Sequence, residues 1–211
     1  DRENLTIAVT YEVNKGPRVY VERINITGNV RTLDYVIRRE MKLAEGDAFN
    51  TALLRLSQSR VRGLDFFEKV EVTQEEGTAP DKTIINVDVQ EKSTGELSVG
   101  AGFSTTESVS ANLQIRERNL LGRGQDLRFG ISVGAQSQTV DIGFTEPYFL
   151  DRDLSAGFDI FRTVRDYQDE SGYDLERTGF VLRSGFPIRE YVRGDVFYSL
   201  VNEKIDNLAS N

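Results

Sequence analysis

From Gly95 onward, apolar and polar residues alternate in a series of segments separated by turn residues. Seven such segments can be read, at 95–104, 108–118, 125–135, 139–146, 154–164, 173–186 and 191–201. Alternation with a period of two puts the apolar side chains on one face of a β-strand and the polar ones on the other. This part of the chain is therefore predicted to form an antiparallel sheet with one apolar face.

Such a sheet can belong to a soluble sandwich or to a barrel that crosses a membrane. Soluble strands usually run about 5–6 residues, whereas a tilted spanning strand needs about 9–11. Most of these segments reach the longer range. Aromatic residues lie near the segment ends, where an interfacial girdle would be, at Phe103, Tyr148, Phe149, Tyr167, Tyr173, Phe186 and Tyr191. Both features favour the membrane barrel over a soluble sandwich or a soluble adhesive β domain.

The residues before position 93 carry a different pattern. Five elements are expected in the order strand, helix, helix, strand, strand: 18–29, 32–43, a helix beginning at Asn50, a strand after 65, and 82–92. Thr32 is the expected N-cap of the first helix. The pattern predicts a small α+β unit with its own core.

Composition excludes several kinds of function. The chain has no His and no Cys, which nearly excludes a zinc site or a nucleophile–His pair. A net charge of −8 argues against a nucleic-acid partner, which would require a basic face. The carboxylates form no convergent set, so we expect no catalytic residues, no metal and no cofactor. We expect binding and remodelling, and no enzyme activity.

Specific motifs carry a resemblance to a known family. "INITGN" at 24–29 followed by "GDAFN" at 46–50 resembles the opening of a POTRA (polypeptide-transport-associated) domain. "RERNLLGRGQDLRFG" at 116–130 and "TEPYFLDRD" at 145–153 resemble the early barrel of the BamA family of outer-membrane assembly factors. The resemblance covers essentially the whole chain. It implies periplasmic POTRA domains that precede an outer-membrane barrel of about sixteen strands.

The resemblance also implies a division of the chain. Residues 1–16 would end a preceding POTRA domain, 17–92 would be a complete POTRA domain of β-α-α-β-β order, and 93–211 would supply about seven N-terminal barrel strands. We therefore expect a fragment of a longer protein. The implied function is folding and insertion of β-barrel proteins into the bacterial outer membrane. Implied partners are unfolded outer-membrane proteins, accessory lipoproteins of the assembly complex and outer-membrane lipid. A TamA-like or two-partner secretion POTRA–barrel translocator is the alternative.

The first barrel strand is the predicted substrate site. In the family this strand meets the last one at a seam that can open sideways, and an open edge offers unpaired N–H and C=O groups to an incoming strand. The predicted residues are Glu96, Leu97, Ser98, Val99, Gly100, Ala101, Gly102, Phe103 and Ser104. Two interpretations of Gly100 and Gly102 stay open, because glycine either weakens the seam or relieves crowding inside a curved wall.

Two further groups of residues are predicted from the family fold. The POTRA edge strand is expected to add substrate strands through Val19, Val21, Arg23 and Ile24. The membrane-interface aromatics are expected to be Tyr148, Phe149, Phe186 and Tyr191. Tyr148 and Phe149 would mark the periplasmic end of the fourth strand, with the charges of 151–153 in water. Residues 91–96 are expected to be a hinge about which the POTRA domain swings.

Overall fold

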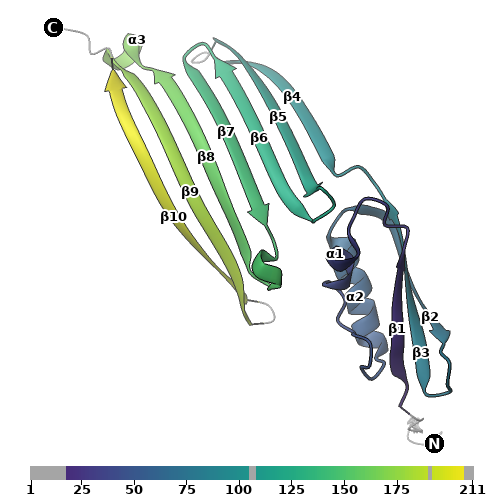
Figure 1. Ribbon diagram of the computed structural model, residues 1–211. Helices are drawn as coiled ribbons and strands as arrows, with labels where there is room; N and C mark the ends of the chain where they lie inside the picture. The colour runs from purple at the N-terminus through teal and green to yellow at the C-terminus, as the bar shows by residue number, and fades with distance from the viewer. Residues whose placement is uncertain (1–17, 105–107, 190–191, 207–211) are drawn as a thin grey trace, which may run out of the picture.

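The computed structural model describes residues 18–104, 108–189 and 192–206 of the 211-residue chain. Within these residues the chain forms two units, a small α+β unit followed by a long curved sheet (Figure 1). The preceding-POTRA assignment for residues 1–16 lies outside the described residues.

The first unit is a three-stranded sheet with two helices on one side. Its elements are β1 (Tyr20–Thr27), α1 (Asp34–Arg38), α2 (Thr51–Gly63), β2 (Phe67–Glu76) and β3 (Lys82–Glu91). The strand order is β1-β3-β2, with β1 parallel and β2 antiparallel to the central β3. The predicted β-α-α-β-β order is confirmed. The core between sheet and helices includes Val21, Ile24, Val36, Ile37, Val61, Phe66, Val70, Ile85 and Val87.

The two helices begin differently. Asn50 caps α2, and its side-chain oxygen accepts hydrogen bonds from the backbone N–H groups of Ala52 and Leu53. The prediction that Thr32 caps the first helix is wrong, because α1 starts at Asp34 with Leu33 as its N-cap. Thr32 is instead buried, and its hydroxyl accepts a hydrogen bond from the Asn119 side chain. The Thr32 hydroxyl therefore makes a tertiary hydrogen bond in place of the predicted helix cap.

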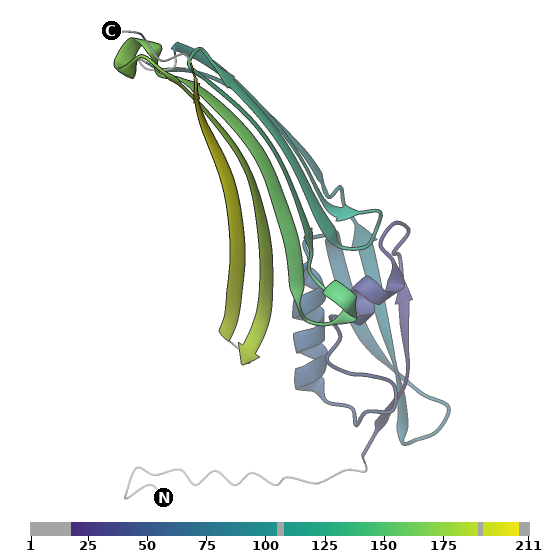
Figure 2. The ribbon, with the colours of Figure 1, turned by 60° about the vertical axis from the view of Figure 1, so that its left-hand side comes forward.

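The second unit is an antiparallel meander of seven strands. They are β4 (Gly95–Ser104), β5 (Ser108–Leu120), β6 (Gln125–Gly134), β7 (Ser137–Glu146), β8 (Ser155–Asp166), β9 (Asp174–Arg189) and β10 (Val192–Asp206). Two short helices lie in the connections, η1 (Phe149–Asp151) and α3 (Gln168–Ser171). The order β10-β9-β8-β7-β6-β5-β4 follows the sequence, so β4 and β10 are the two edges. Figure 2 shows the curvature of this sheet. The seven predicted strands are confirmed.

The faces of the sheet differ in chemistry. Phe144 and Phe158 are cross-strand partners on the apolar face, with ring centroids 5.8 Å apart. On the other face, Arg128 and Arg183 both pair with Asp159, at 3.0 Å and 2.6 Å. The alternation in the sequence therefore separates an apolar surface from a polar one that carries ion pairs.

Two details complete the fold. Pro187 belongs to β9 and lies opposite Arg193, so the strand runs further than the alternating segment 173–186. No helix among the described residues is long and apolar enough to span a membrane.

Candidate functional site: an open strand edge and a docked junction

Strand β4 has a neighbour on one side only. It pairs with β5 in an unbroken register from Gly95 opposite Glu117 to Ser104 opposite Ser108. No strand lies along its other side within the part of the chain that the structure describes. The side chains of Leu97, Val99 and Phe103 are 68%, 75% and 79% exposed. All the predicted seam residues, 96–104, therefore lie on one free edge; nothing is described of the Ser104 side chain.

The glycines of β4 make room for side chains on β5. A Cβ on Gly100 would collide with the Asn112 side-chain oxygen, and one on Gly102 would lie 3.3 Å from the Ser110 hydroxyl. The same relation recurs at Gly130, where a Cβ would collide with Asp141. This geometry supports the interpretation that the glycines relieve crowding. A weak seam stays a prediction.

Strand β1 is also at a sheet edge, but that edge is partly covered. The Val21 N–H donates to the Asp47 carbonyl over 2.9 Å, and the Gly46 N–H donates to the Val21 carbonyl over 2.7 Å. The Val19 carbonyl accepts from the Phe49 N–H over 2.8 Å.

The Ile24 N–H donates in turn to the Glu45 carboxylate over 3.1 Å. The chain after α1 therefore folds back over this edge at Val19, Val21 and Ile24, and the addition of substrate strands at these residues stays a prediction. Arg23 is exposed at a register shift in the β1–β3 pairing.

Tyr148 joins the two units. Its hydroxyl donates to the Glu40 carboxylate over 2.9 Å and accepts from the Arg60 guanidinium over 3.2 Å. Arg60 also pairs with Glu40 at 2.8 Å, and Glu40 is buried. The Arg39 guanidinium carbon lies 4.2 Å from the centre of the Tyr148 ring, a cation–π contact. Burial and the Glu40 carboxylate raise the pKa of Tyr148 to about 12, so its hydroxyl is protonated at neutral pH and can donate.

A second contact forms at the β5–β6 turn. The Leu33 N–H donates to the Gly122 carbonyl over 2.9 Å. The Asn119 side chain donates to the Thr32 hydroxyl over 2.9 Å and accepts from the Gly124 N–H over 2.7 Å. The Asn119 side chain thus links the β5–β6 turn to the first unit.

Residues 91–96, which connect the two units, also make hydrogen bonds or ion pairs with both of them. Lys92 donates through its backbone N–H to the Phe66 carbonyl over 3.0 Å. Arg118 bridges Asp65 at 2.6 Å and Glu96 at 2.8 Å, one in each unit. The structure therefore shows a docked arrangement at the connector. Swinging about 91–96 stays a prediction, and it requires these contacts to break.

The predicted interface aromatics lie in different settings. Tyr148 packs on the first unit, as described, while Phe149 and Phe186 are 42% and 38% exposed. Tyr191 lies outside the described residues. Their position at a membrane surface stays a prediction. Sequence reasoning missed the contacts of Glu40, Arg60 and Asn119, because their partners lie far away in the chain and no local pattern indicates them.

The two units match two family models. Residues 19–92 match the POTRA model, described as a surface antigen variable number repeat. Residues 119–211 match the Omp85 superfamily domain.

The chain belongs to the Omp85 superfamily.

Curated and solved relatives agree with this assignment. The outer membrane protein assembly factor BamA of Nitratidesulfovibrio vulgaris is 33% identical over 90% of this chain, and that of Neisseria meningitidis is 31% identical over 96%. The crystal structure of BamA from Haemophilus ducreyi lacking POTRA domains 1–3 superposes with a TM-score of 0.78 at 30% identity, covering 92% of this chain and 37% of that one. CdiB from Acinetobacter baumannii, at 14% identity and a TM-score of 0.63, shares the fold.

This Omp85 chain spans 24% and 26% of the length of the two curated relatives. Its first described unit is a POTRA domain, and its sheet is the start of a BamA-like barrel. The barrel lies in the bacterial outer membrane and the POTRA domain in the periplasm. Tyr148, which follows β7, and Asn119, near the end of β5, therefore lie at the periplasmic end of the barrel.

Proposed function

We propose that the whole protein is an outer-membrane protein assembly factor, which folds β-barrel proteins and inserts them into the membrane. The observation that carries this proposal is the likeness of both units to BamA, at 30% identity and a TM-score of 0.78. The BamA relatives, which are named as assembly factors, support it. No covalent chemistry is required, because the work is strand pairing.

The proposed mechanism is templating at the β4 edge. An incoming strand would add to β4 through main-chain hydrogen bonds, which do not depend on the client's sequence. Within hydrocarbon no water can satisfy unpaired N–H and C=O groups, and each one costs several kcal/mol. Strand pairing at this edge therefore lowers the free energy more than strand pairing at an edge in the periplasm, where water can satisfy the backbone groups.

Capture of unfolded clients by the POTRA domain is the second part of the proposal. The hydrogen bonds to residues 45–49 cover much of the β1 edge. We therefore assign capture to the far end of β1, from Asn25 to Thr27, rather than to Val19, Val21 and Ile24. Accessory lipoproteins and outer-membrane lipid are proposed partners, in line with the family.

Crosslinking tests the templating step. Cysteine at Ser98 should form a disulfide with a cysteine in the last strand of a client stalled during assembly. Cysteine at Ser132, on strand β6 with neighbours on both sides, is the matched control and should not crosslink. The chain has no native cysteine to interfere. Crosslinks that are as strong from Ser132 as from β4, or that are absent along β4, would rule out templating by this strand.

A further inference from the structure

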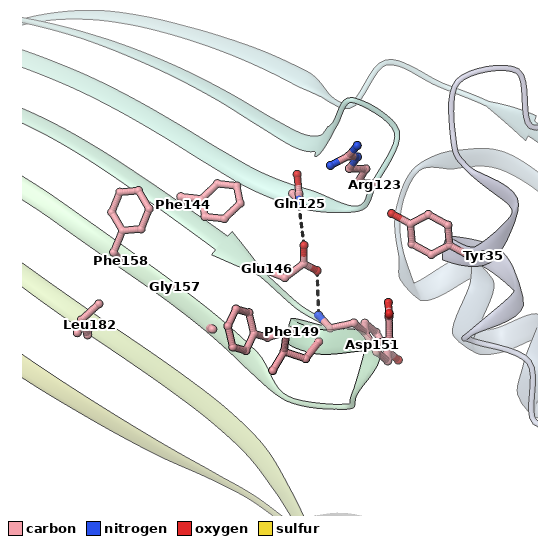
Figure 3. Close-up of a pocket in the computed structure, with 13 residues that line it drawn as sticks. Tyr35, Arg123, Gln125, Phe144, Glu146, Phe149, Asp151, Gly157, Phe158 and Leu182 are labelled. Atoms are coloured by element: carbon pink, nitrogen blue, oxygen red, sulfur yellow. Dashed lines mark hydrogen bonds between the residues drawn. The ribbon is translucent and has the colours of Figure 1, made fainter.

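A groove opens where the POTRA domain meets the barrel sheet. Its volume is about 610 Å³, and Tyr35 on α1 faces residues of β6 to β9 and η1 across it (Figure 3). An adjoining cavity of about 650 Å³ shares Tyr35, Tyr148 and Asp151 and adds Arg38 and Arg39. No assembly step described above uses this groove.

One wall of the groove is part of the apolar face of the sheet. Phe144, Phe158 and Leu182 are cross-strand neighbours on β7, β8 and β9, and all three line the groove. Leu182 is 47% exposed. The apolar face of an outer-membrane barrel lies against acyl chains. The groove is therefore continuous with the lipid-facing surface at its periplasmic end.

The other end of the groove carries charges of both signs. Within the described residues, Arg123 and Asp151 line the groove and neither has an ion-pair partner there. Arg39 stacks on Tyr148, and its buried Nε and Nη2 have no hydrogen-bond acceptor in the described structure. Glu146 is already engaged, since it accepts from the Gln125 side chain and the Tyr148 N–H. The groove and the adjoining cavity thus carry two cations without an ion-pair partner, Arg39 and Arg123, and two carboxylates, of which only Asp151 has no hydrogen-bond donor among the described residues.

The turn that holds Asp151 is strained. Leu150 and Asp151 have φ values of 58° and 57°, in the left-handed region that side chains other than glycine, asparagine and aspartate rarely adopt. Leu150 is also 73% exposed. Strain of this kind persists where surrounding contacts enforce it, and it often marks a binding site. Here it presents an apolar side chain and a carboxylate beside the groove.

We propose that this groove binds one phospholipid of the periplasmic leaflet whose headgroup carries a protonated primary amine, as phosphatidylethanolamine does. The acyl chains lie on Phe144, Phe158 and Leu182. Arg123 binds the phosphate, with the positive charge of Arg39 behind it, and Asp151 accepts from the ammonium group. Zwitterionic chemistry fits because the site offers charges of both signs. The inference rests on the outer-membrane location of the sheet and does not depend on assembly activity.

Lipid binding to the full-length protein tests this proposal. The delipidated protein in neutral detergent is titrated with dioleoyl phosphatidylethanolamine, phosphatidylglycerol or phosphatidylcholine, and bound lipid is counted by native mass spectrometry. One phosphatidylethanolamine should be retained in preference to the other two. Arg123→Gln should weaken its binding about tenfold, the size expected for losing a charge-assisted hydrogen bond. Asp151→Asn should remove the preference for phosphatidylethanolamine while leaving phosphatidylglycerol binding unchanged or stronger.

Control experiments distinguish a specific lipid-binding site from non-specific contact with lipid. Arg177→Gln removes a cation at the far end of β9 that pairs with Glu203, and it should leave lipid retention unchanged. A phosphatidylethanolamine with a diazirine in its acyl chain should label the peptide that contains residues 144–158. Free phosphorylethanolamine should compete poorly, because it lacks the acyl contact.

Equal retention of all three lipids in the parent protein and in both groove variants would overturn the proposal. So would effective competition by free phosphorylethanolamine, since the ligand would then be a soluble phosphate. Client assembly is measured separately: normal lipid binding with failed assembly argues against the proposed function alone, and the reverse result argues against the lipid site alone.

Discussion

The hydroxyl of Tyr148 lies 2.9 Å from a carboxylate oxygen of Glu40, although the two residues are 108 positions apart in the chain. Glu40 is buried in the POTRA domain, and Tyr148 follows the end of β7 in the barrel. With Arg60 donating to both, the three side chains form a polar cluster that holds the two domains together. Docking of the POTRA domain therefore depends on a few named contacts.

Tyr148→Phe should loosen the docked state. The change removes the bond to Glu40 and the one from Arg60 but keeps the ring under Arg39, so we expect a loss of about 1–2 kcal/mol. The docked population should fall by about five- to thirtyfold relative to the undocked one. The distribution of distances between spin labels at Arg55 on α2 and Arg189 on β9 should broaden. Tyr198→Phe, on an exposed ring of β10, is the control and should leave the distribution unchanged.

Asn119 and Thr32 should prove energetically coupled. Asn119→Ala removes the bond to Thr32 and leaves the Gly124 N–H without its acceptor, so we expect undocking to become easier by about 1–3 kcal/mol. Thr32→Ala should have a smaller effect on docking, because it removes only one bond between the two units. The same label pair measures a double-mutant cycle, in which the two effects should not add. If the effects of the two substitutions simply add, the hydrogen bond between Asn119 and Thr32 contributes little to docking.

Gly157→Ala should destabilise the barrel wall. A Cβ there would lie 2.7 Å from the Phe144 backbone oxygen, which cannot move aside without disturbing the sheet. Overpacking of this kind costs about 1–3 kcal/mol. Urea denaturation in detergent should show a lower midpoint. Gly63→Ala, at the end of α2 with no atom within 4 Å of the new Cβ, is the control and should be neutral or stabilising by up to about 1 kcal/mol.

Acid should loosen the start of α1 through Glu91. Partial burial would raise the pKa of Glu91, but the N–H groups of Thr32 and Arg31 donate to its carboxylate and hold the pKa below its usual value of 4.5. The stabilisation is therefore complete above about pH 4.5 and is lost as the pH falls through the lowered pKa.

Amide exchange provides the measurement. Protection of the Thr32 amide, corrected for intrinsic exchange, should fall in the parent protein as the pH drops below about 4.5 and through the lowered pKa of Glu91. In Glu91→Gln it should be low throughout and insensitive to pH. A parent protein whose protection stays constant over this range would contradict the role of the carboxylate.

Proline in the two edge strands should have unequal effects on assembly. Ala101→Pro removes a backbone donor of β4 within the membrane, where no water can replace the lost bond. Val21→Pro removes the N–H that donates to Asp47 in the periplasm, where water can compensate. Client insertion rates should therefore fall more for Ala101→Pro. Equal rates, with both variants inserted normally, would speak against templating at β4.

The sequence alone determined the elements and the family. The alternation after Gly95 predicts seven strands because the period of a strand fixes which side chains share a face. Asn50 marks the start of α2 because a cap is a local interaction between residues two or three apart. The motifs "INITGN" and "GDAFN" identify the POTRA domain because its turns need particular residues, such as Gly28 with a φ of 86°.

Only the tertiary structure decided which hydrogen bonds the polar groups of these elements make. Thr32 has the sequence position of a cap, yet it bonds to Asn119; Tyr148 looks like an interfacial aromatic, yet it bonds to Glu40. The β1 edge looks free in sequence, yet residues 45–49 cover it. Periodicity reports local geometry and the side on which a residue is buried. A hydrogen bond between residues far apart depends on how whole domains dock, and no local pattern encodes that.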